Sequence, residues 1–71
     1  MDENYINIFI GRKIREARVQ KGITQQMLAD ACDMEIPNLS RIEHGKTNPT
    51  VRTLFKLCQA LDFPMQDLFR F

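Results

Sequence analysis

Half of the basic residues in this chain lie close together in the sequence. The five are Arg12, Lys13, Arg15, Arg18 and Lys21, and Glu16 is the one acidic residue among them. Ammonium and guanidinium groups gathered in this way can contact the phosphates of a nucleic acid. A solvated face of a surface helix has the same composition, so the cluster indicates phosphate contacts only if another segment can read bases. The net charge of +1 favours neither interpretation.

A second group of polar residues lies between positions 35 and 44. Asn38, Arg41 and His44 recur at every third position, and Glu35 precedes them. Arginine can donate two hydrogen bonds to guanine, so this pattern suits the reading of base edges. On spacing alone, the exposed face of a plain helical hairpin is an equally good interpretation.

Residues for catalysis or metal binding are scarce. His44 is the single histidine, and Cys32 and Cys58 stand far apart at apolar positions of helical patterns. We interpret both cysteines as small reduced core residues, not as metal ligands or a disulfide. The sequence also offers no histidine–nucleophile pair, no convergent carboxylates and no Gly-rich phosphate loop. We therefore expect no enzyme activity, no metal and no cofactor.

Short helices must position these residues, because apolar side chains recur at three- and four-residue intervals throughout the chain. Thr24 and Thr50 can cap helix N-termini, Pro37 suits a first turn, and Gly22 and Gly45 suit helix ends. No alternating strand pattern and no repeat occurs. We predict an all-α fold with helices at about 4–20, 25–32, 36–43, 51–61 and 65–69.

The length and composition indicate one domain, residues 1–71. A chain of 71 residues with 44% hydrophobic and 27% charged residues is ordinary for a soluble protein. No apolar run approaches the roughly 18 residues that a membrane span needs. The start of the chain, Met1 to Asn4, is acidic and does not resemble the basic leader of a secreted protein. We expect a cytoplasmic protein without a membrane contact.

The segment 24–43 combines two short predicted helices with a turn of about three residues between them. Ala29 is small at the position where the first of these helices must approach its partner closely. Apolar residues of the segment point to a shared core, and they are Leu28, Cys32, Met34, Leu39 and Ile42. One face of the second helix then stays free of the core, and the major groove of DNA admits one such helix.

Several segments together carry a more specific motif. They are Gly22–Ala29, Leu39–Lys46, Asn48–Thr50, Leu54, Leu61 and Asp67–Phe69. This combination resembles the Cro/C1-type (Xre-like) helix-turn-helix regulators over roughly residues 8–69, with a motif core at 22–45. The resemblance implies a compact five-helix domain like that of lambda repressor, in which the second and third helices form the helix-turn-helix. It also implies a transcriptional regulator of the repressor type that binds a pseudo-palindromic operator in double-stranded DNA as a homodimer.

The resemblance also implies roles for particular residues. Ile36, Pro37 and Arg41 match the family's principal base-reading positions, with Glu35 just before them, and we add Asn38 from the exposed face. Gln25, Lys46 and Thr47 match phosphate contacts, to which we add the neighbouring cap Thr24, Arg15 from the basic cluster and His44 from the exposed face. Arg18 and Glu43 match a buried ion pair that ties the first helix to the end of the third. Gln25, Arg41 and Glu43 could each instead be solvated surface residues. No small-molecule ligand is implied.

The sequence departs from the family pattern at the turn and at the start of the third helix. Asp33 replaces the usual turn glycine, which predicts a slightly strained turn or one held by an aspartate hydrogen bond. Ile36 and Pro37 offer no side-chain donors, so apolar contact with thymine methyl groups is the expected readout. Asp33 and Glu35 bring negative charge near the DNA, which lowers affinity unless Glu35 accepts a hydrogen bond from cytosine.

Large apolar residues crowd the C-terminus, and they are Phe63, Met65, Phe69 and Phe71. We predict that they form the dimer interface, since an exposed apolar surface of this kind usually marks a contact site. The alternative is that Phe63 and Leu68 simply close the core of the monomer. A different function also stays open, because an antitoxin or another protein-binding module can use the same fold.

Overall fold

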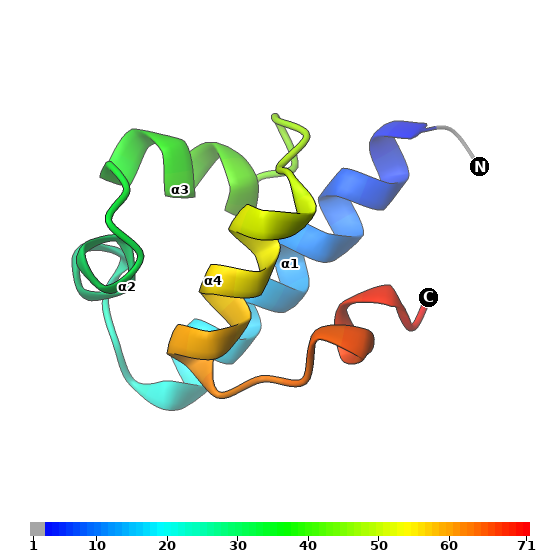
Figure 1. Cartoon of the computed structure of the whole chain (residues 1–71). Coiled ribbons are helices and arrows are strands. Elements are labelled where there is room, and N and C mark those ends of the chain that lie inside the picture. The colour runs from blue at the N-terminus through cyan, green and yellow to red at the C-terminus, as the bar shows by residue number, and fades with distance from the viewer. Residues whose placement is uncertain (1–2) are drawn as a thin grey trace.

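The computed structural model describes residues 3–71, and these form four α-helices and one short 3₁₀ helix (Figure 1). The elements are α1 (Glu3–Lys21), α2 (Gln25–Ala31), α3 (Ile36–Glu43), α4 (Val51–Leu61) and the 3₁₀ helix η1 (Met65–Phe69). No strand occurs in residues 3–71, so the predicted all-α class is confirmed there. Met1 and Asp2, which belong to the acidic start of the chain, lie outside the described residues.

The prediction of a fifth α-helix is wrong, because η1 is a 3₁₀ helix. The Asp67 amide donates to the Pro64 carbonyl at 3.0 Å, which is the three-residue spacing of a 3₁₀ turn. A segment of five residues is too short to offset the entropy lost in nucleating an α-helix. Leu68 is fully buried and holds this turn against the core.

Local side-chain chemistry sets the other helix boundaries close to the expected residues. The hydroxyl oxygens of Thr24 and Thr50 accept from the amides of Met27 and Thr53, both at 3.1 Å, and so cap α2 and α4. Pro37 lies in the first turn of α3, where its missing N–H has no helical partner to lose. The first residues of α2, α3 and α4 are therefore specified by their immediate neighbours in the sequence.

Asp33 makes the turn between α2 and α3 with a left-handed backbone, at φ 54°. This conformation suits glycine and costs most other residues roughly 1–2 kcal/mol, although aspartate tolerates it better than most. Among residues 3–71 the Asp33 carboxylate has no hydrogen bond that could offset it. Of the two expectations for this turn, backbone strain is the one that the structure shows.

The core draws on every α-helix and on η1. Its buried residues are Ile10, Ile14, Leu28, Ala29, Cys32, Leu39, Ile42, Leu54, Leu57, Cys58, Leu61 and Leu68. Burial raises the pKa of the Cys32 thiol, an effect that nearby Lys56 opposes, and burial likewise raises the pKa of the Cys58 thiol. Both cysteines are free and remain neutral thiols at ordinary pH, as suits small core residues.

Two glycines allow α1 to lie directly against the end of α3. A Cβ atom on Gly11 would lie 2.1 Å from the carbonyl oxygen of Ile42, and one on Gly45 would lie 2.6 Å from the Cα of Ile8. Both obstacles include backbone atoms, so neither can turn away. The two glycines thus fix the separation between α1 and α3.

We expect Gly11→Ala to lower the free energy of unfolding by about 1–3 kcal/mol, because the added methyl group overpacks the crossing of α1 and α3. Chemical denaturation followed by circular dichroism measures this. Gln20→Ala, at an exposed position of α1, is the control and should change stability by less than about 0.5 kcal/mol. Helix propensity alone predicts the opposite sign, so a more stable Gly11→Ala variant would contradict the assignment.

Candidate nucleic-acid interface

Helix α3 presents one face to the core and the other to solvent. Leu39, Ile42 and Glu43 are buried, whereas Pro37 and Arg41 are exposed on the opposite side. In Figure 1 α3 lies along one edge of the molecule, with α2 beside its N-terminal end. A short exposed helix of this kind matches the width of the DNA major groove.

The five candidate base-reading residues differ in solvent exposure and in the contacts that their side chains already make. Glu35, Pro37, Asn38 and Arg41 are exposed, and Arg41 Nη2 donates to Asn38 Oδ1, so these two side chains already support each other. Ile36 is half-buried and packs against the core. The core therefore covers part of the Ile36 side chain, and less of its surface is available to contact DNA.

The candidate phosphate contacts surround α3. Thr24 is exposed at the start of α2, and Lys46 is exposed in the loop after α3. Thr47 is half-buried in a shallow hollow that Asn38 and Arg41 also line. Arg15 is exposed and lies four residues after Gly11, which packs against the end of α3, so the two residues share one side of α1.

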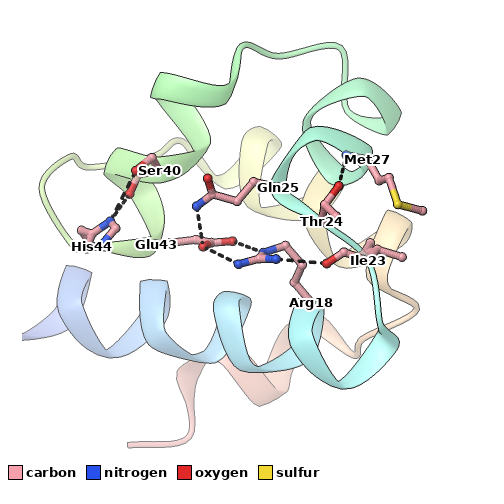
Figure 2. Close-up of polar contacts among 8 residues, drawn as sticks. All are labelled: Arg18, Ile23, Thr24, Gln25, Met27, Ser40, Glu43 and His44. Atoms are coloured by element: carbon pink, nitrogen blue, oxygen red, sulfur yellow. Dashed lines mark hydrogen bonds and ion pairs between the residues drawn. The ribbon is translucent and has the colours of Figure 1, made fainter.

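His44 makes a local contact that limits its use on a phosphate. Its Nδ1 lies 2.8 Å from the carbonyl oxygen of Ser40, so this nitrogen carries a proton and donates (Figure 2). A neutral ring in this tautomer has only an acceptor at Nε2. His44 can therefore donate to a phosphate only in its doubly protonated, cationic form.

A partly buried hydrogen-bonded network joins α1, α2 and α3 (Figure 2). Arg18 Nε lies 2.7 Å from Glu43 Oε2, and Arg18 Nη2 lies 3.2 Å from Glu43 Oε1. The third nitrogen of the guanidinium, Nη1, donates to the Ile23 carbonyl at 3.0 Å. Side-chain exposure is 12% for Arg18 and 0% for Glu43. The two residues expected to face each other are thus brought together out of solvent.

Gln25 belongs to the same network. It is half-buried, and its Nε2 donates to Glu43 Oε1 at 3.0 Å. From the sequence, Gln25 is expected on DNA and Glu43 in an ion pair, and the hydrogen bond between them is not predicted. Gly11 was also missed, although an isolated glycine inside a helical pattern is a signal of close packing.

The four residues predicted for a dimer interface differ in their exposure and in their contacts. Phe63 and Met65 are half-buried against the core. Phe71 is 61% exposed, and its ring meets the Phe9 ring edge-on at 4.7 Å between centroids. Phe69 is also exposed.

Phe55 is a further exposed aromatic that sequence reasoning missed. It lies on α4, is 49% exposed, and lines an open groove together with Phe63, Pro64 and Met65. Its position outside the apolar stripe of α4 is the signal that could have identified it, since a large apolar residue off the stripe faces solvent.

The fold and this site define a helix-turn-helix protein. The family model for helix-turn-helix proteins matches residues 14–68, and the chain belongs to this family, in its Cro/C1-type branch of transcriptional regulators. The family is one of regulators and not of enzymes. Within the described residues, no helix is both long and apolar enough to cross a membrane.

Two named regulators are similar in sequence. The control protein C.BamHI of Bacillus amyloliquefaciens is 33% identical over 69 residues, covering 96% of this chain and 85% of that protein. The HTH-type transcriptional regulator DdrOP3 of Deinococcus deserti is 34% identical over 56 residues, or 79% of this chain. That match spans only 43% of DdrOP3, so the chain corresponds to less than half of its length.

A solved structure is similar along its whole length. The restriction-modification controller protein C.AhdI from Aeromonas hydrophila superposes with a TM-score of 0.90 at 29% identity, covering 97% of this chain and all of that one. The clp gene regulator ClgR of Corynebacterium glutamicum superposes with a TM-score of 0.86 at 28% identity, covering 90% of this chain and 83% of that one.

Removal of Glu43 should destabilise the protein far more than loss of a surface ion pair. We expect Glu43→Ala to lower stability by about 3–5 kcal/mol, because Arg18 is left buried without a counter-charge. Asp67→Ala is the control: Asp67 pairs with Arg70, whose side chain is 73% exposed, and its loss should cost under about 1 kcal/mol. Thermal melting of both variants measures the difference, and equal losses would contradict a structural role for the buried pair.

Proposed function

We propose that this protein is a sequence-specific DNA-binding transcriptional regulator of the repressor type, which inserts α3 into the major groove. The observation that carries the proposal is the division of α3 into a buried face with Leu39 and Ile42 and an exposed face with Pro37, Asn38 and Arg41. Family membership supports the same function. A cytoplasmic location, with access to the chromosome, belongs to this proposal.

In this proposal the exposed residues divide into two kinds of contact. Arg41 can make two hydrogen bonds to one guanine, and its neighbour Asn38 holds it in place. Glu35 can accept from the amino group of a cytosine, and Pro37 can touch a thymine methyl group. The residues on phosphates are Arg15, Thr24, Gln25, Lys46 and Thr47, with His44 when its ring is charged. Phosphate contacts hold the protein on DNA and carry no direct sequence information.

Selection of bound sequences from random duplex DNA is the direct test of this function. A two-fold symmetric consensus is the expected result, with half-sites about one DNA turn apart. If no sequence is enriched, the proposal fails, and a protein-binding role such as that of an antitoxin becomes the better explanation.

We further propose that the protein binds as a homodimer through the groove at Phe55, Phe63, Pro64 and Met65. The groove offers an exposed apolar surface. One chain measures 33 × 23 × 20 Å. Two chains side by side can therefore set their α3 helices about 34 Å apart, the length of one DNA turn.

Arg41→Ala should relax the preference at one base pair in each half-site and leave the other positions nearly unchanged. The lost discrimination should be about 1–3 kcal/mol, the value of a bidentate arginine–guanine pair. Lys46→Ala, which removes a proposed phosphate contact, should instead weaken all duplexes by a similar factor. Binding to a set of single-base operator variants at one salt concentration distinguishes the two. A uniform loss with Arg41→Ala would make Arg41 a phosphate contact and not a base reader.

Phe55→Asp should shift the protein toward monomer, because it places a charge in the proposed apolar interface. Sedimentation equilibrium measures this at concentrations where the unaltered chain dimerises. Phe71→Ala is the matched control, since Phe71 packs on Phe9 of its own chain and should not affect assembly. If Phe55→Asp dimerises normally while a chain cut before Phe69 does not, the interface lies at the C-terminus and this assignment is wrong.

A further inference from the structure

Glu43 accepts a hydrogen bond from Gln25 in addition to the hydrogen bonds of its ion pair with Arg18. Its Oε2 accepts from Arg18 Nε, and its Oε1 accepts from two donors, Arg18 Nη2 at 3.2 Å and Gln25 Nε2 at 3.0 Å. The carboxylate therefore links the end of α1 to the first residue of α2. Because Glu43 is also the last residue of α3, three helices meet at one charged group.

Arg18 prevents this carboxylate from moving. The guanidinium holds both Glu43 oxygens and also donates to the Ile23 carbonyl at 3.0 Å. The Glu43 side chain is fully buried, so water does not compete for it. A carboxylate fixed in this way is a rigid acceptor for Gln25.

Gln25 keeps hydrogen-bonding capacity beyond this contact. A glutamine amide has two N–H donors and one carbonyl acceptor. One N–H is bonded to Glu43, while the second N–H and the carbonyl oxygen have no partner among residues 3–71. Gln26 provides a contrast, because it is exposed and reaches only Asp30, at 3.4 Å.

We propose that Glu43 is a positioning residue for DNA binding, which holds the Gln25 amide in the orientation that meets a phosphate. This inference rests on the proposed function and extends it to a residue that does not touch DNA. A side chain held in its bound conformation loses less entropy on binding, so affinity rises. Arg18 cancels the charge of Glu43, so the carboxylate orients Gln25 without repelling the phosphate.

The test is a double-mutant cycle between Gln25 and the ion pair. Arg18→Met together with Glu43→Met removes the acceptor and leaves the net charge unchanged, and replacing both partners avoids the buried unpaired charge that a single replacement would leave. In the unaltered chain, Gln25→Ala should weaken binding to a selected duplex about tenfold or more. In the chain that carries both methionine replacements, the same change should weaken binding less than about threefold, because no acceptor is left to hold the amide.

Lys46→Ala in both backgrounds is the matched control. The Lys46 side chain makes no hydrogen bond or ion pair with Arg18, Gln25 or Glu43, so its loss should be equal in the two cases. An equal tenfold loss from Gln25→Ala in both backgrounds would overturn the inference while leaving the proposed function intact. Failure of the unaltered chain to bind any duplex would overturn both.

A second measurement needs no variant that could misfold. Side-chain amide relaxation by nuclear magnetic resonance on the unaltered, DNA-free protein compares Gln25 with Gln26. We expect Gln25 to show the higher order parameter, since its amide is held before DNA arrives. Equal order parameters for the two side chains would overturn the inference.

Discussion

The ion pair between Arg18 and Glu43 is the interaction on which the arrangement of the helices depends. A carboxylate with no exposed surface is tolerated only where its charge is matched and its oxygens are hydrogen-bonded. Arg18 supplies both conditions and also ties down the loop carbonyl of Ile23. The pair thus joins segments that lie 25 residues apart in the sequence. A helix of eight residues such as α3 is not stable alone in water, so its position is set by such tertiary contacts.

Steric constraints, together with the ion pair, fix the position of α3 against α1. Gly11 lets α1 touch the carbonyl end of α3, and Gly45 lets the following turn pass against Ile8. Larger side chains at either place would push α3 outward and lengthen the bonds to Glu43. The buried ion pair attracts the end of α3 toward α1, and the two glycines leave room for that close approach.

Much of this fold follows from local sequence signals. The bounds of α3 and α4 coincide with the predicted 36–43 and 51–61, because Pro37, Gly45 and Thr50 act on their immediate neighbours. The prediction of an α-helix at 65–69 was wrong because apolar spacing does not indicate whether backbone hydrogen bonds span three residues, as in a 3₁₀ helix, or four, as in an α-helix. The contacts of Gln25 with Glu43 and of Phe71 with Phe9 depend on side-chain placement across long sequence distances, which periodicity does not encode.

The strained turn at Asp33 has a consequence for how such a protein can change over generations. Because Asp33 adopts a left-handed backbone with no compensating side-chain hydrogen bond among residues 3–71, a more stable variant at this position is available to the fold. A single exchange to glycine would provide that stability without touching the reading face or the buried pair. The chain therefore carries a reserve that could absorb destabilising changes at Pro37, Asn38 or Arg41, and a new operator preference could arise without loss of folding.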